Sequence, residues 1–218
     1  MGRGLENGPE LPFQMLLDAM EGVSYIVDRD RRLLCCGRRN WSCFARENGG
    51  AGIADPGSVI GRSILDFVGG DDVIAAYRGY MSELFDGAIE AVAFEFRCDA
   101  PDMRRDLWMT IRPLEADGRI DALLFQSITV RELTRPVLGI FDFEALRAHA
   151  SNRQSLPIVT LCAYCARVAT AAVGEDERKW VSAETYYQNG GTSEVRLSHG
   201  ICGSCHDRYV AALLAAET

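Results

Sequence analysis

Two pairs of cysteines near the C-terminus constrain this chain more than any other feature of its sequence. Cys162 and Cys165 form the first C-x2-C pair, and Cys202 and Cys205 form the second after 36 intervening residues. Two residues between thiols let one tight turn direct both sulfurs at a single ion, and two such turns complete a tetrahedral four-sulfur site. A soft, all-sulfur donor set selects zinc or an iron–sulfur centre over hard cations. We therefore expect residues 158–218 to form a four-cysteine module with zinc as its structural cofactor.

The second pair admits other interpretations. Cys202-Gly-Ser-Cys205-His206 matches the attachment motif of c-type haem, but the N-terminus lacks the apolar segment of an export signal. A dithiol switch needs only one pair, although a reactive thiolate cluster can also lose its metal on oxidation. His199 or His206 could replace one cysteine as a ligand. Structural zinc is the favoured interpretation, and redox sensing through the same site stays open.

Composition and charge indicate a soluble globular protein. Of the 218 residues 48% are hydrophobic and 25% charged, and a chain of this length can bury a substantial core. The net charge is −8 at pH 7 and no block is basic, so the electrostatic signature of nucleic-acid binding is missing. No segment approaches the length of a membrane span. We expect a cytoplasmic location, reduced thiols, and neither membrane nor nucleic acid as a partner.

The order of elements indicates an α+β domain. Residues 11–22 have helical spacing, and two short apolar runs around the turn "DRDR" predict a hairpin. Asn40 is a candidate cap for a short helix, and Asp71 or Asp72 for a longer amphipathic helix. Three strand-like segments follow, with "ADGR" as the turn between the last two, at residues 91–99, 106–115 and 120–130. This order predicts a five-stranded, mostly antiparallel sheet with helices on one face.

Several motifs in this order resemble those of PAS domains. They are "YIVDRDRRLL" before the Asn-led helix, "VIGRSILDFVGGDD" before the long helix, and "IRPLEADGRIDALLFQSITVREL". The last is similar to the final PAS strand pair and its "DIT-x-R" exit, with Ser127 where Asp is usual. The C-terminal "LCAYC" and "SHGICGSC" resemble a zinc-binding segment attached to some bacterial PAS proteins. The resemblance implies a PAS-like sheet with helices on one face, plus a small zinc-stapled α/β module.

These observations divide the chain into four parts. We expect a disordered N-terminus at 1–10, a PAS-like sensor domain at 11–135, and a linker at 136–157 followed by the zinc module. The linker should contain a helix that starts at Asp142, which can serve as its N-cap.

A PAS fold can hold a small ligand between its sheet and its helices. Candidate lining residues are the bulky and aromatic side chains Trp41, Phe44, Tyr77, Met81, Phe94 and Trp108. The same side chains could equally fill the core. No histidine lies within residues 1–135, so a histidine-ligated haem has no ligand there, and the flavin photosensor motif is missing from the sequence. The pocket ligand therefore stays unidentified.

No catalytic motif is evident, so we do not expect an enzyme. The favoured function is a PAS-type sensor or adaptor in bacterial signal transduction or regulation, acting through contacts with another signalling protein of unknown identity. The helix at 11–22 should support a homodimer through the PAS domain. The alternative is a redox- or zinc-responsive regulator in which the four-cysteine cluster is the sensor. A DNA-binding transcriptional regulator is the least favoured, because the C-terminal block is acidic.

Overall fold

The computed structural model describes residues 13–150, 155–170 and 178–211. The expected disorder at 1–10 and the end of the C-terminal helix lie outside these residues. No helix in the described part of the chain is long and apolar enough to cross a membrane.

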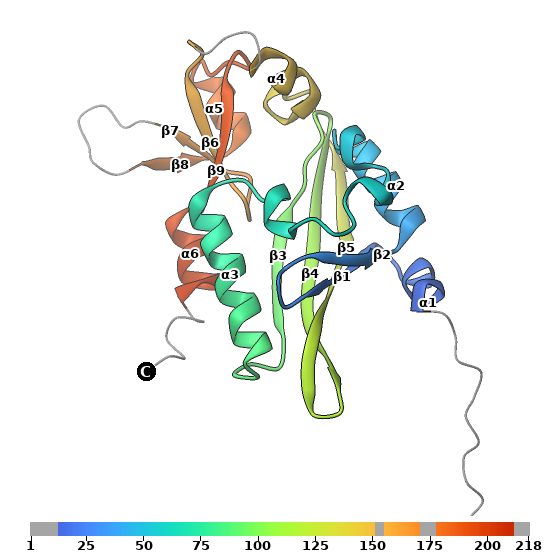
Figure 1. The fold of residues 1–218 in the computed structure, drawn as a ribbon. Coiled ribbons are helices and arrows are strands. Elements are labelled where there is room, and N and C mark those ends of the chain that lie inside the picture. The colour runs from blue at the N-terminus through green and yellow to red at the C-terminus, as the bar shows by residue number, and fades with distance from the viewer. Residues whose placement is uncertain (1–12, 151–154, 171–177, 212–218) are drawn as a thin grey trace, which may run out of the picture.

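The N-terminal part forms one antiparallel sheet with helices on one face (Figure 1). Its elements, in chain order, are α1 (Phe13–Ala19), β1 (Val23–Asp28), β2 (Leu33–Cys36), α2 (Arg38–Glu47), α3 (Asp71–Phe85), β3 (Val92–Arg97), β4 (Met103–Ala116) and β5 (Arg119–Thr134). Within the described residues the sheet has five strands in the order β2-β1-β5-β4-β3. Three short 3-10 turns connect α2 to α3. The α+β class with a five-stranded antiparallel sheet and helices on one face, expected from the sequence, is confirmed.

Alternate residues of β4 and β5 are apolar, and their side chains form much of the core. Leu107, Met109 and Ile111 point to the inner face of β4, and Leu123 and Phe125 do so on β5. Successive side chains of a strand point to opposite faces, so these residues form one apolar surface beneath α3. The turn between the two strands places residues 117 and 118 at φ 52° and 73°, the backbone of a two-residue hairpin turn.

Two predicted helix caps are wrong, and a third is confirmed. Asn40 lies inside α2 and its amide donates to the Met20 carbonyl over 2.8 Å, while Gly37 is the N-cap. The N-cap of α3 is Gly70 at φ 90°, and both candidate aspartates lie in the first turn. Acidic side chains are favourable there because of the helix dipole. Asp142 caps α4 (Phe143–Ala150) as predicted, accepting a hydrogen bond from the Ala145 amide at 3.0 Å.

The C-terminal part forms a second, smaller sheet. Its strands are β6 (Ile158–Cys162), β7 (Val168–Thr170), β8 (Lys179–Val181) and β9 (Arg196–Gly200), and its helices are α5 (Ala183–Gln188) and α6 (Gly203–Tyr209). The strand order is β8-β7-β6-β9, with β6 and β9 parallel. Figure 1 shows this module at one end of the larger sheet, with α6 beside α3. The small α/β module expected from the sequence is therefore present.

The module and the larger domain share one hydrophobic core. Tyr164 is 3% exposed, and its hydroxyl lies 2.7 Å from the hydroxyl of Tyr80 on α3. The Tyr80 hydroxyl donates to the Tyr209 carbonyl on α6 over 2.9 Å. A side chain at Gly70 would collide with the backbone carbonyl of His199, so the contact also requires a glycine there. The two parts therefore pack as one body.

Candidate metal centre

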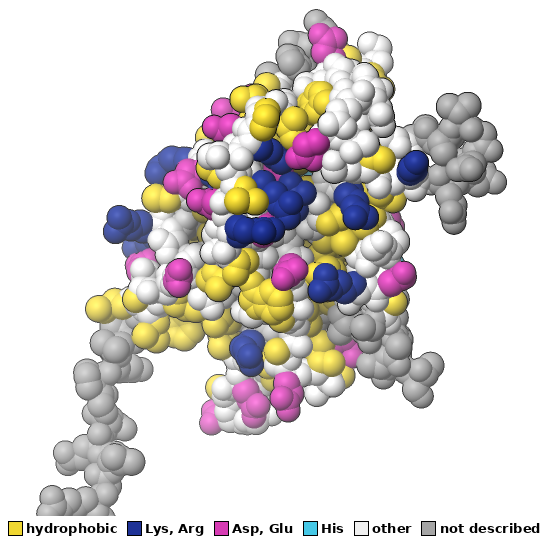
Figure 2. All heavy atoms as spheres, turned by 180° about the vertical axis from the view of Figure 1, so that it is seen from behind, with side chains coloured by type: hydrophobic (Ala, Val, Ile, Leu, Met, Phe, Trp, Pro, Cys, Tyr) yellow, Lys and Arg dark blue, Asp and Glu magenta, His cyan; other side chains and the backbone are white. Residues whose placement is uncertain are grey.

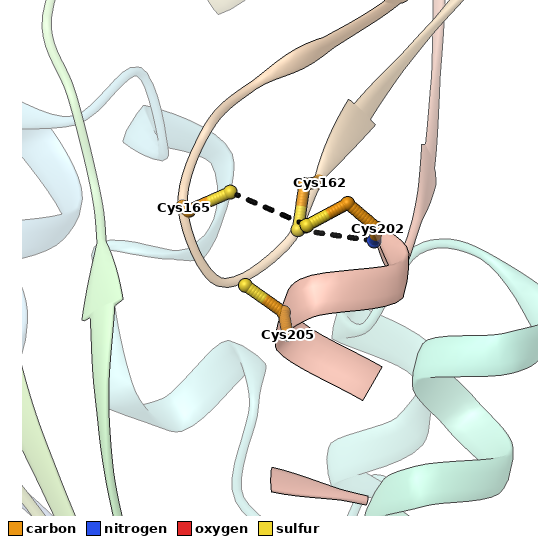
Figure 3. Close-up of side chains that lie close together, drawn as sticks. All are labelled: Cys162, Cys165, Cys202 and Cys205. Carbon is orange, nitrogen blue, oxygen red and sulfur yellow. Dashed lines mark hydrogen bonds between the residues drawn. The ribbon is translucent and has the colours of Figure 1, made fainter. Parts of the chain in front are cut away.

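The four cysteines come from two turns that follow neighbouring strands. Cys162 ends β6, and Cys165 lies in the turn after it. Cys202 follows β9 as the N-cap of α6, and Cys205 lies in the first turn of that helix. Because β6 and β9 are parallel and pair Cys162 with Gly200, both turns leave the sheet at the same end. The side chains converge as Figure 3 shows.

The geometry of the cluster fits one metal ion. All four sulfurs lie within 4.8 Å of one another, and the Sγ atoms of Cys165 and Cys202 are 3.7 Å apart. A tetrahedral ion about 2.3 Å from each sulfur separates the sulfurs by about 3.8 Å. A polynuclear iron–sulfur cluster also contains bridging sulfides and would hold the thiolates further apart. The arrangement therefore favours a single ion over a larger cluster.

Without a bound cation, ionisation of one thiol in the cluster hinders ionisation of the others. Hydrogen bonds from the Cys165 and Cys205 thiols lower the pKa of Cys162, which also accepts from the Cys202 amide over 3.4 Å. The resulting Cys162 thiolate raises the pKa of Cys165 to about 12 and raises the pKa of Cys205. A bound divalent cation removes this conflict, because thiols coordinate as thiolates. The donor set therefore fits a soft divalent ion.

Neither candidate histidine belongs to the cluster, which among the described residues consists of cysteines alone. His199 pairs with Leu161 across the β6–β9 ladder, and its ring packs against Gly69. Burial lowers the pKa of His199. His206 is exposed on α6, with Nδ1 3.7 Å from the Asp207 carboxylate. The structure thus brings together the four predicted cysteines and leaves both histidines outside.

An open cleft leads from the cluster to the outer face of the large sheet. It has a volume of about 510 Å³ and is lined by Cys165, Cys205 and the exposed Trp108, among others. Arginines border it, and Arg97 donates to the Cys165 carbonyl over 3.1 Å. Basic side chains also gather next to hydrophobic ones when the molecule is viewed from behind (Figure 2). Arg97 pairs with Asp99 and Arg104 pairs with Asp106, so these cations already have acidic partners.

The predicted pocket residues occupy three different environments. Trp41, Phe44 and Tyr77 line one cavity of about 440 Å³. Met81 and Phe94 are 1% and 2% exposed and pack in the core. Trp108 does not belong with them, because it is 38% exposed and points to the opposite face from Leu107 and Met109. Apolar residues occur on both faces of β4, so the sequence pattern alone did not identify which face points to the core.

Sequence reasoning missed that the module forms part of this cavity. Leu161, Ala163 and His199 line it together with residues of the larger domain. No local sequence pattern signals this, because the wall depends on how two parts of the chain pack.

No family model matches the chain, and no curated protein matches it. Solved structures are similar in part. The PAS domain of BvgS from Bordetella pertussis is 16% identical, covering 66% of this chain and 95% of that one with a TM-score of 0.35. A sensory box sensor histidine kinase from Vibrio cholerae is 16% identical, covering 54% and 88% with a TM-score of 0.37. VqmA from Vibrio cholerae is 13% identical, covering 54% and 49% with a TM-score of 0.38. We draw no functional conclusion from these likenesses.

Proposed function

We propose that this protein is a PAS-type sensor or adaptor in signal transduction, with a C-terminal module held by a structural zinc ion. One observation carries the proposal. Tyr164, located between two of the four cysteines, is buried in the core of the larger domain and meets Tyr80 of α3 at 2.7 Å. A structural change in the larger domain would therefore alter the structure of the module, and loss of the metal ion would alter the structure around α3.

The ligand set supports a structural rather than a catalytic ion. Catalytic zinc keeps one position open for water, whereas four protein thiolates complete a tetrahedral shell. We therefore propose that the chain is not an enzyme and that its output passes through contacts with another signalling protein. We further propose that it acts in the cytoplasm, where reduced thiols remain available to the metal.

Exposed apolar side chains on α1 support a homodimer through the larger domain. Phe13, Met15 and Leu16 are 54%, 57% and 51% exposed, and Leu34 of β2 is 48% exposed. Exposed apolar clusters of this kind commonly mark protein contacts. A second copy of this chain is the partner we propose for this surface.

Exposure of one ligand supports an alternative function, a redox- or zinc-responsive regulator. Cys165 is half-buried and lines the open cleft, and its sulfur lies 3.7 Å from that of Cys202. Peroxide could take two electrons from these thiolates, forming a disulfide and water and releasing the ion. In that case the cluster itself would be the sensor.

Hydrogen exchange of the zinc-loaded and chelated protein tests the main proposal. Removal of the ion should increase exchange in α3 as well as in the module, because the core is shared. The Cys165→Ser variant should reproduce the increase, whereas Cys43→Ser should not, since Cys43 is exposed and outside the cluster. Unchanged exchange in α3 after complete zinc removal would contradict the proposal.

Treatment with mild peroxide separates the alternative from a purely structural site. Release of zinc together with a change in oligomeric state supports the redox-responsive regulator. If the protein keeps both its zinc and its oligomeric state at peroxide concentrations that oxidise the exposed Cys43, the redox-responsive regulator is excluded.

A further inference from the structure

The peptide group between Cys165 and Ala166 is held at both of its polar atoms. Its oxygen accepts a hydrogen bond from the Arg97 guanidinium over 3.1 Å, and its amide donates to the Cys162 carbonyl over 2.9 Å. The backbone amide of Arg97 also donates to the Tyr164 carbonyl over 2.8 Å. The end of β3 therefore contacts the turn that carries the first two cysteines through both its backbone and a side chain.

The backbone of this turn has an unfavourable conformation at Ala166. Its φ is 55°, in the left-handed region that residues with a side chain seldom adopt, and Ala166 is only 7% exposed. Such a conformation persists only where the surrounding contacts enforce it, so the turn can relax when one of them is lost. The hydrogen bond from Arg97 is a contact of this kind, because it fixes the orientation of the peptide group that precedes Ala166.

Arg97 is itself held by a buried carboxylate. Two nitrogens of its guanidinium donate to Asp99, whose side chain is fully buried. Asp99 also accepts from the Arg135 guanidinium over 2.8 Å and from the Arg105 amide over 3.3 Å. A guanidinium that donates two parallel hydrogen bonds to one carboxylate has a well-defined orientation. Because Arg135 directly follows β5, this carboxylate connects the end of the large sheet to the metal turn.

Cys165 is the most accessible of the four cysteines in the cluster. It is half-buried, whereas the other three, Cys162, Cys202 and Cys205, are 2%, 2% and 8% exposed. Its side chain extends from the turn toward the other sulfurs, as Figure 3 shows, and it lines the open cleft. The Cys165 sulfur therefore needs the least opening of the core to exchange the cluster for solvent.

We propose that Cys165 is the ligand that leaves the metal first, and that Arg97 and Asp99 are positioning residues that control how readily it leaves. Arg97 holds the Cys165–Ala166 peptide group in the orientation that keeps the sulfur in the cluster, and Asp99 acts through Arg97. A displacement of Arg135 weakens this hold through the shared carboxylate. The inference rests on the proposed function, for which it adds a second route from the larger domain to the ion, separate from the contact between α3 and the module.

Timed alkylation of the full zinc-loaded chain with N-ethylmaleimide, followed by mass spectrometry of its peptides, tests the inference. Among the four ligands Cys165 should be modified first, and the exposed Cys43 reports the activity of the reagent. In Arg97→Lys, modification of Cys165 and zinc release to a chelator should both be roughly tenfold faster, because one ammonium replaces the fork that serves Asp99 and the Cys165 carbonyl together. Asp99→Asn should speed modification of Cys165 in the wild type but add little in Arg97→Lys.

Arg104→Lys is the matched control. The Arg104 guanidinium pairs with Asp106 two residues further along β4, as Arg97 pairs with Asp99, but donates no hydrogen bond to the described residues of the module. This variant should keep both wild-type rates. If Arg97 only stabilised the fold, Arg97→Lys would lower the free energy of unfolding and expose all four ligands together.

That outcome, wild-type rates in Arg97→Lys, or earlier modification of another ligand in the wild type overturns the inference. Additive effects of Arg97→Lys and Asp99→Asn on Cys165 overturn the role of Asp99. The proposed function fails in a different way, because the wild-type chain would then bind no zinc before any variant is made.

Discussion

Replacing Tyr80 by phenylalanine should loosen the metal centre, although Tyr80 is not a ligand. Its hydroxyl donates to the Tyr209 carbonyl over 2.9 Å and lies 2.7 Å from the Tyr164 hydroxyl. Since a phenol has one proton, the Tyr164 hydroxyl must be the donor between the two tyrosines. Tyr80→Phe therefore removes two hydrogen bonds that join α3 to the module.

The free energy lost in Tyr80→Phe follows from the two polar groups that this substitution leaves without their hydrogen-bond partner. The Tyr164 hydroxyl is buried, and leaving such a group unsatisfied costs about 1–3 kcal/mol. The Tyr209 carbonyl lies on a half-buried residue, where water can replace part of the lost bond. A total loss of about 2 kcal/mol corresponds to roughly 30-fold faster zinc release, provided that release requires this contact to open. Tyr164→Phe should cost less, because Tyr80 keeps its bond to Tyr209.

Zinc release to a chromophoric chelator, measured alongside denaturant unfolding, checks this prediction. Tyr186→Phe serves as the control, because it removes a hydroxyl from the same module away from α3. A Tyr80→Phe protein with a lower free energy of unfolding but a wild-type rate of zinc release would refute this coupling. That result would mean that the module holds its ion independently of the larger domain.

Three further predictions concern the fold, the dimer and pH. Gly70→Ala should destabilise the protein by more than about 1 kcal/mol in denaturant titrations, because φ is 90° there and a side chain meets the module backbone. Leu16→Asp should convert the proposed dimer to a monomer in sedimentation experiments, with an unchanged circular dichroism spectrum. Burial opposes ionisation of Asp106, but hydrogen bonds from Arg104 and Arg131 outweigh it and lower its pKa. Its contribution to stability is present above the unfolded pKa of about 3.9 and is lost as pH falls through the lower folded value, so Asp106→Asn should flatten the acid limb of the stability profile.

Short-range patterns made much of the fold predictable. Strand alternation and the "ADGR" turn identified the final hairpin, and the C-x2-C spacing identified all four members of the cluster. Each of these signals involves residues a few positions apart. Within such a range, backbone geometry leaves few alternatives.

Features that depend on distant packing were not predictable. Gly70 replaces the expected aspartate cap because the backbone of His199 approaches it closely. Trp108 faces outward although both faces of its strand carry apolar residues. Tyr164 becomes a core residue only because β6 and β9 pair in parallel and place its turn against α3. In each case the deciding neighbour lies far away in the sequence.

We propose that the four cysteines hold one zinc ion. X-ray absorption at the zinc edge, combined with metal analysis of protein purified without added metal, tests it most directly. We predict close to one zinc per chain and a first shell of four sulfurs at about 2.3 Å. A folded protein without metal, or a zinc shell containing nitrogen or oxygen, would contradict the account.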